Sequence, residues 1–129
     1  MLVHRGFYDD FDPALLYRGD WTNDKNFAEP DLHTISYTDV AGSEVEIAFE
    51  GKALTYVYTK AVNRGIASVT VDGVDRGAVD LYSAVTQWQS RTRFCCFGPG
   101  RHMAVIRATG RANPQSKGKF IDLDSFTVE

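Results

Sequence analysis

The stretch from Glu44 to Thr59, EVEIAFEGKALTYVYT, decides the fold class of this chain. Apolar residues alternate with mostly acidic ones up to Gly51, and a second alternating run follows that glycine. The apolar or aromatic positions are Val45, Ile47 and Phe49 in the first run and Leu54, Tyr56 and Tyr58 in the second. A period of two is that of a β-strand with one buried face, so this stretch predicts two consecutive strands.

The same pattern continues toward the C-terminus. Further strands are predicted at residues 66–71, 77–81, 88–97, 102–109 and 120–128. Asp72-Gly73 lies between two of these runs and is a hairpin signal, because both residues tolerate positive φ. Helical periodicity with a cap is not convincing anywhere. The sequence therefore predicts roughly eight to ten short strands in an all-β antiparallel sandwich of the jelly-roll type.

Length and charge limit the functions that are open to the chain. Its 129 residues, 43% hydrophobic and 24% charged, predict one soluble globular domain over residues 1–129. The 14 Lys and Arg residues against 17 Asp and Glu give a net charge of -3, which disfavours nucleic acid and anionic membranes as partners. Residues 1–12 lack the pattern of a signal peptide, so we expect an intracellular protein or an excised module.

The two cysteines, Cys95 and Cys96, are adjacent in the sequence. Neighbouring Cα atoms lie closer together than the usual span of a disulfide, and in a strand the two side chains would point to opposite faces. The spacing therefore predicts free thiols, and it leaves the redox compartment open.

Seven short motifs follow one another along nearly the whole chain. They are Tyr17-x-Gly19-x-Trp21, Phe49-x-Gly51, Arg64-Gly65-x-Ala67-x-Val69-x-Val71-Asp72-Gly73, Val79-Asp80-Leu81-Tyr82-Ser83, Gly100-x-His102, Gly110-x-x-Asn113 and Asp122-x-Asp124-x-Phe126-x-Val128. In this order they resemble the galactose-binding-domain-like β-sandwich modules appended to bacterial glycoside hydrolases and other surface proteins. The resemblance implies a jelly-roll fold, a noncatalytic sugar-binding role, often one structural calcium ion, and an extracellular or cell-surface location within a larger protein.

Catalytic patterns find little support. The sequence has no Gly-x-Ser-x-Gly elbow, its three histidines are scattered, and zinc-ligand spacing is absent. Nothing in the spacing nominates two of the carboxylates as a glycoside-hydrolysing pair. We therefore expect a protein that is not an enzyme, with His102 as a hydrogen-bonded structural residue.

Acidic residues gather near both ends of the chain. In the last predicted strand Asp124 shares the parity of Phe126, so it would face inward unless a bulge intervenes, and a buried carboxylate needs a partner. A calcium ion would supply one. The resemblance assigns the early ligand to Asp10 or Asp12 and the late ligand to Asp124. The alternative is a set of solvated acidic residues with a bulge.

A sugar site combines an aromatic ring, on which the C–H face of the sugar stacks, with planar polar side chains for its hydroxyls. Trp88, between two glutamines, is a candidate platform or a packed residue, whereas Trp21 is expected in the core. Loop residues supply the polar half, and as a group they look like the loop-end sugar site of the resembling modules. They are Asn63, Arg64 and Asn113, with Lys60 and Asn26 as outside candidates.

Each of these polar residues also has a purely structural interpretation: the asparagines in turns and Arg64 in a surface ion pair. On the sugar-binding interpretation, truncating Arg64 or Asn113 to Ala should weaken binding by roughly 1 to 3 kcal/mol and leave the fold intact, because both residues lie in polar turns. The function predicted from the sequence is a noncatalytic carbohydrate-binding module that targets a parent enzyme or surface protein to a polysaccharide. The alternative is a structural or protein-interaction sandwich without sugar binding, and a glycan-binding assay separates the two.

Overall fold

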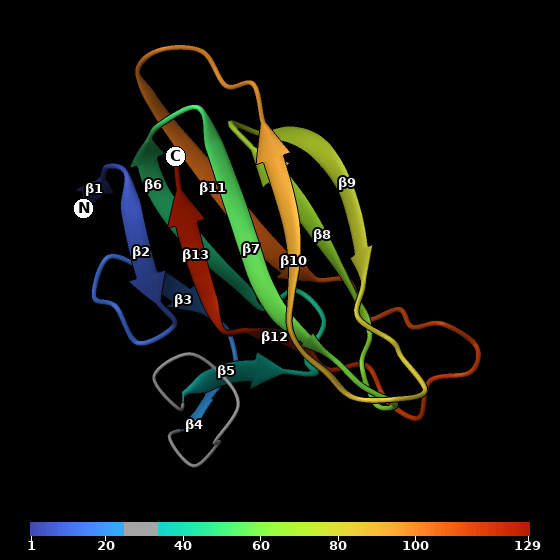
Figure 1. The fold of residues 1–129 in the computed structure, drawn as a ribbon. Helices are drawn as coiled ribbons and strands as arrows, with labels where there is room; N and C mark the ends of the chain where they lie inside the picture. The colour runs from blue at the N-terminus through green and yellow to red at the C-terminus, as the bar shows by residue number, and fades with distance from the viewer. Residues whose placement is uncertain (25–33) are drawn as a thin grey trace.

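The computed structural model describes residues 1–24 and 34–129 (Figure 1). These residues form thirteen strands joined by turns. The strands are β1 (Leu2–Val3), β2 (Gly6–Asp9), β3 (Leu16–Arg18), β4 (Thr22–Asp24), β5 (Ile35–Thr38), β6 (Glu44–Glu50), β7 (Ala53–Lys60), β8 (Ile66–Val71), β9 (Val74–Asp80), β10 (Gln87–Cys95), β11 (Arg101–Ala108), β12 (Ile121–Leu123) and β13 (Ser125–Val128). Within the described part of the chain, no helix is long and apolar enough to cross a membrane.

Two sheets face each other, and a third, smaller sheet lies at one end of them. The first sheet has the order β1-β6-β11-β8-β9, with β3 also paired to β6, and the second has the order β10-β7-β13-β2. The third has the order β12-β5-β4 and lies at the end opposite the C-terminus (Figure 1). All pairings between these strands are antiparallel except that of β1 with β6. The predicted all-β antiparallel sandwich is confirmed, and the finer jelly-roll description stays a prediction.

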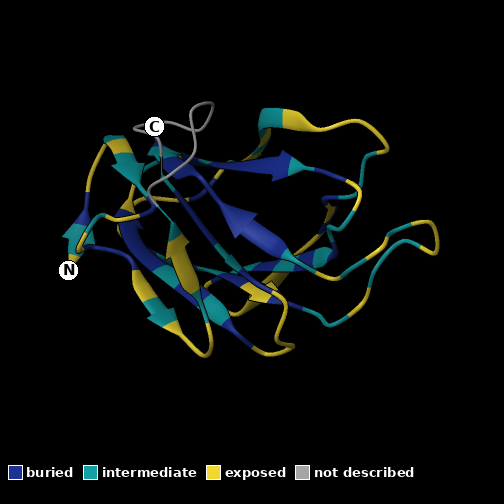
Figure 2. Ribbon diagram, turned by 90° about the horizontal axis from the view of Figure 1, so that it is seen from below, coloured by how far each residue is buried: buried dark blue, intermediate teal, exposed yellow. Residues whose placement is uncertain are grey.

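The core lies between the two large sheets, where Figure 2 shows buried strands inside a rim of exposed loops. Its members are the alternate apolar positions that the sequence pattern assigns to the buried face of each strand. They include Val45, Ile47 and Phe49 of β6, Leu54, Tyr56 and Tyr58 of β7, Val69 and Val71 of β8, and Phe126 and Val128 of β13. The predicted core residue Trp21 is half-buried and packs against this cluster with its ring edge to face with Tyr17.

The deciding stretch contributes one strand to each sheet. β6 belongs to the first sheet and β7 to the second, so the turn between them crosses from one sheet to the other. Gly51 stands at the crossing, where an added Cβ would lie 2.6 Å from the backbone oxygen of Glu129. The Asp72-Gly73 hairpin is confirmed as well, because both residues have positive φ, 55° and 77°, between β8 and β9.

The last predicted strand, residues 120–128, is divided in two. β12 pairs with β5 in the small sheet, and β13 pairs with β7 and β2 in the second large sheet. Asp124 separates them and is fully buried, as the strand parity predicted for an unbulged chain. The change of sheet at this residue lets the Asp122 side chain contact Arg64 and the backbone N–H of Thr59 while Phe126 stays in the core.

The prediction of free thiols was wrong. Cys95 and Cys96 form a disulfide across a Cα–Cα distance of 3.7 Å. The expectation assumed a regular strand, but β10 ends at Cys95 and Cys96 has a φ of 76°. In this left-handed conformation the two side chains no longer point to opposite faces, so the sulfur atoms meet.

His102 is the structural residue that the sequence indicated. Its Nδ1 lies 2.6 Å from Asp72 Oδ2, and its Nε2 lies 2.6 Å from the carbonyl oxygen of Gly98. Both partners accept hydrogen bonds, an arrangement that only the protonated ring satisfies at both nitrogens. The hydrogen bond that His102 donates to Asp72, and after it the one that it donates to the Gly98 carbonyl oxygen, raises the pKa of His102 above 6.5. The bond to His102 lowers the pKa of Asp72 below 3.8.

We therefore expect the His102–Asp72 contact to stabilise the fold most in mildly acidic solution. The raised pKa of His102 gives a contribution that is complete below 6.5 and is lost as pH rises through the folded-state pKa. The lowered pKa of Asp72 gives a second contribution to stability, which is lost as pH falls below 3.8. In thermal melts, the melting temperature of wild type should exceed that of His102→Gln by a larger margin at about pH 6 than at about pH 9. Asp72→Asn should remove this difference, and parallel curves for wild type and His102→Gln would contradict the assignment.

Candidate functional site

A pocket of about 360 Å³ opens at the end of the sandwich that carries the small sheet. It is lined by Ile35, Tyr37, Asn63, Arg64 and Phe120. These residues come from β5, from the turn between β7 and β8, and from the position just before β12. Segments distant in the sequence therefore meet at this end of the molecule (Figure 1).

The polar side of the pocket is fixed by a buried ion pair. Arg64 Nε donates to Asp122 Oδ2 at 2.5 Å, and the Asp122 side chain is fully buried whereas that of Arg64 is 14% exposed. The backbone N–H of Thr59 donates to the other carboxylate oxygen at 2.7 Å. Burial raises the pKa of Asp122 to about 6, against the opposing effects of the Arg64 charge and the Thr59 hydrogen bond.

Asn63 is oriented by the same guanidinium group. Arg64 Nη1 donates to Asn63 Oδ1 at 2.6 Å. A guanidinium has five N–H donors, more than these contacts with Asp122 and Asn63 use. The structure thus brings together two of the polar residues singled out in the sequence, with their side chains already ordered.

The apolar side consists of two rings that sequence reasoning missed. Tyr37 and Phe120 are both half-buried, and their centroids lie 5.8 Å apart with an interplanar angle of 74°. In the sequence, Phe120 marks only the start of the last predicted strand, and Tyr37 follows a segment without a clear alternating run. The sequence signal that could have identified Phe120 as a site residue is its place between the polar loop at residues 110–119 and the strand that follows it.

Backbone contacts hold the loops around the pocket in place. Gly65 N–H donates to the carbonyl oxygen of Phe120 at 2.7 Å, and Phe120 N–H donates to that of Asn63 at 3.2 Å. An added Cβ at Gly65 would lie 2.6 Å from the backbone oxygen of Lys119, so no other residue fits without moving the chain. Ser116 adds a hydroxyl bond to the carbonyl oxygen of Arg64 at 2.6 Å. The pocket therefore has a preformed wall.

The other predicted ligand residues do not line this pocket. Asn113 lies in the neighbouring loop, where its Oδ1 accepts from the Gln115 N–H at 3.0 Å and its Nδ2 donates to Asp80 at 3.3 Å. Lys60 ends β7 opposite Gln87, the residue before Trp88. Trp88 is half-buried at a β-bulge of the edge strand β10. Asn26 lies outside the described residues. For all four, a role in binding stays a prediction.

The acidic residues near the chain ends lie close together, because β2 pairs with β13. Asp10 N–H donates to the carbonyl oxygen of Asp124 at 3.0 Å. The Asp10 side chain is fully buried and accepts from Ser36 Oγ at 2.6 Å and from the Thr34 hydroxyl. Burial, with a smaller effect of neighbouring Asp9, raises the pKa of Asp10 to about 7.

The donors near Asp10 fit a calcium ion in kind, since carboxylate and hydroxyl oxygens are hard ligands. Buried Asp9 Oδ1 has no hydrogen-bond partner among the described residues. Asp10 and Asp12 line one small pocket of about 250 Å³, although Asp12 Oδ1 also accepts from the Ala14 N–H at 2.9 Å. Within the described ranges, no three His, Cys, Asp or Glu side chains form a metal-binding group by themselves. Calcium thus stays a prediction that would need further oxygen ligands.

No protein-family model matches the chain, but two curated proteins from Flavonifractor plautii do. The A type blood N-acetyl-alpha-D-galactosamine deacetylase is 39% identical over 83 residues, which are 63% of this chain and 10% of that protein. The A type blood alpha-D-galactosamine galactosaminidase is 28% identical over 123 residues, 94% of this chain and 10% of that protein. The chain thus spans about a tenth of the length of these relatives, and both relatives bear the names of carbohydrate enzymes.

Solved structures show the same fold at low sequence identity. A two-domain esterase active on acetylated mannans has a TM-score of 0.71 at 16% identity, over 95% of this chain and 36% of that one. A family two carbohydrate esterase from Cellvibrio japonicus has a TM-score of 0.69 at 15% identity, over 95% and 32%. A Paenibacillus xanthan lyase has 0.65 at 18%, over 95% and 13%. The fold is therefore one found in carbohydrate-active enzymes.

The structure changes the expected effect of substituting Arg64. A residue in a polar turn should be dispensable for folding, but here its removal leaves the buried Asp122 carboxylate without its counter-charge. We expect Arg64→Met to lower the free energy of unfolding by roughly 3 to 5 kcal/mol. Adding Asp122→Asn should restore part of that loss, because the buried charge is then gone. Urea unfolding measures both effects, and an unchanged midpoint for Arg64→Met would contradict them.

We also expect calcium to stabilise the contact between the chain ends. Chelation should lower the melting temperature, because carboxylates near Asp10 would repel one another in a partly buried place, and calcium should restore it. Magnesium should substitute poorly, since it demands tighter octahedral geometry. Asp124→Asn should remove most of the calcium dependence. Superimposable melting curves in chelator, calcium and magnesium, with no bound metal by elemental analysis, would contradict the prediction of a stabilising calcium ion.

Proposed function

We propose that this chain is a noncatalytic carbohydrate-binding module of the galactose-binding-domain-like kind. The observation that carries the proposal is the pocket beside β5, which places two aromatic rings against an arginine and an asparagine. Tyr37 and Phe120 offer apolar surface to the C–H face of a sugar ring. Arg64 and Asn63 offer hydrogen bonds to its hydroxyls. The pocket thus contains both halves of a saccharide site.

The proposed module would act within a larger protein. The relatives from Flavonifractor plautii are about ten times longer than the matched region, so their deacetylase and galactosaminidase activities belong to proteins with much more chain than this one. In the proposal, this domain keeps an attached catalytic or surface domain near its polysaccharide. The disulfide supports an extracellular or cell-surface location, because disulfides persist in oxidising compartments.

Binding would proceed by stacking and hydrogen bonding, without bond cleavage. Affinity for a single short glycan should be modest, on the order of micromolar to millimolar, since an open polar site gains little once water is displaced and side chains are ordered. Attachment to a second binding module would raise the effective affinity.

Calorimetric titration with N-acetylgalactosamine, mannopentaose and cellohexaose tests the proposed function. We expect measurable binding to at least one of these sugars, and Tyr37→Ala or Asn63→Ala should weaken it by roughly 1 to 3 kcal/mol. Trp88→Ala belongs in the series, because a loss of binding without a loss of stability would identify a second stacking platform.

Gln115→Ala is the matched control, since Gln115 is an exposed polar residue at the same end that does not line the pocket. It should bind like wild type. Asn113→Ala measures whether the site extends over the neighbouring loop. Isotherms that stay flat for every sugar, together with a well-folded protein, would favour a structural or protein-interaction sandwich instead.

A further inference from the structure

A second and larger pocket, of about 720 Å³, lies beside the Cys95–Cys96 disulfide. Its volume is within the range typical of small-molecule sites. It is lined by the turn between β6 and β7, by the end of β10, and by the loop at residues 96–100. This is the end of the sandwich near the C-terminus, opposite the pocket beside β5 (Figure 1).

The backbone around this pocket is held in one arrangement. The N–H groups of Cys96 and Phe97 both donate to the carbonyl oxygen of Lys52, at 2.9 and 3.2 Å. Lys52 N–H in turn donates to the carbonyl oxygen of Glu129 at 2.6 Å. The Phe97 ring is buried and packs edge to face against Phe49, with centroids 5.6 Å apart. A ligand would therefore meet a surface that is already formed.

The disulfide gives the pocket an unusual wall. Cys96 has a φ of 76°, a left-handed conformation that costs energy for a residue other than glycine and that tends to occur at functional sites. Cys96 is exposed and Cys95 is half-buried, and both line the pocket. Sulfur is polarisable and apolar, so two bonded sulfur atoms form a small, rigid, non-hydrogen-bonding surface.

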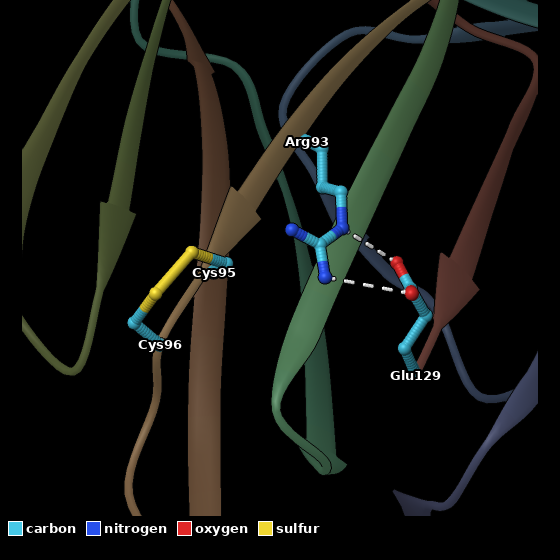
Figure 3. The surroundings of a disulfide bond; sticks show 4 residues. All are labelled: Arg93, Cys95, Cys96 and Glu129. Carbon is cyan, nitrogen blue, oxygen red and sulfur yellow. Dashed lines mark hydrogen bonds and ion pairs between the residues drawn. A yellow bond between two sulfur atoms is a disulfide. The ribbon is translucent and has the colours of Figure 1, made fainter.

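The charges at the rim nearly cancel. Arg93 comes two residues before Cys95 on β10 and is paired with Glu129, with Nε 2.8 Å from Oε2 (Figure 3). Glu50 and Lys52 line the pocket with opposite charges. Such a rim favours neither an anion nor a cation, but it offers donors and acceptors to hydroxyl groups.

We propose that this pocket is a second saccharide site, in which the C–H face of a neutral sugar ring lies on the Cys95–Cys96 disulfide and Pro99. Lys52 and Glu50 would bind the hydroxyls of that ring. The inference rests on the proposed function for the class of ligand, but it uses a separate set of residues. It would make the module bivalent, with one binding pocket at each end of the sandwich.

Amide chemical shifts distinguish the two pockets in a single experiment. The ¹⁵N-labelled chain is titrated with N-acetylgalactosamine, mannopentaose or cellohexaose. We expect two groups of shifted amides, one around Asn63 and Phe120 and one around Lys52 and residues 95–98. Cys95→Ala/Cys96→Ala should weaken the second response by about tenfold while leaving the first unchanged. Asn63→Ala should weaken the first response, around Asn63 and Phe120, and leave the second response unchanged.

Two further measurements guard against a misfolded double variant. Lys52→Ala leaves the disulfide in place and should also weaken only the second response. Dithiothreitol should do the same in wild type, because it transfers two electrons and two protons to the S–S bond and is itself oxidised to a cyclic disulfide.

The outcomes separate this inference from the proposed function. Shifts confined to the Asn63 group would overturn the second site and leave the proposed function standing. Shifts confined to the disulfide group would support the second site and remove the first pocket as the binding site. An unchanged second response in the double variant, in Lys52→Ala and after reduction would also overturn the inference. No shifts with any sugar would contradict both proposals.

Discussion

The buried contact between Arg64 and Asp122 is the interaction on which the candidate site depends. A carboxylate that is fully removed from water is costly unless it is paired and hydrogen-bonded, and here one guanidinium and the Thr59 N–H meet that requirement. The same guanidinium donates a hydrogen bond to Asn63, which also lines the pocket. Stability at this end of the sandwich and the geometry of the proposed sugar site therefore rest on one side chain, so substitutions of Arg64 affect both together.

Much of the fold could be predicted, because the alternation of buried and exposed residues is a local property. Residues 44–50 and 53–60 are strands where the pattern placed them, and Asp72-Gly73 forms its hairpin. The partner of Asp122 could not be predicted in this way. Arg64 is 58 residues away, and only the division of the last strand at Asp124 turns the carboxylate toward it. The pocket rings are also joined only by tertiary contacts, since Tyr37 and Phe120 lie on separate segments.

The cysteine pair shows the limit of the local pattern in another form. Period-two reasoning places adjacent side chains on opposite faces, and in this strand it holds from Ser90, after the bulge at Trp88, to Phe94. It failed at Cys96, where the chain leaves the strand with a left-handed φ. No residue type at positions 95–100 predicts a left-handed φ at Cys96, although Gly98, Pro99 and Gly100 predict the loop that follows. The left-handed φ of Cys96 thus allows the two cysteines to form a disulfide that lines a pocket, in place of the two free thiols that the sequence predicted.

The two pockets are held by different kinds of interaction, and this follows from the sandwich itself. The inner faces of the two large sheets pack against each other in the core, and loops at the two ends of the sandwich line the two pockets. At one end the chain turns around a buried ion pair. At the other end it crosses between the sheets at Gly51 and is held by backbone hydrogen bonds and a disulfide. The contacts described for one end share no residue with those of the other, so each pocket can change without altering its counterpart.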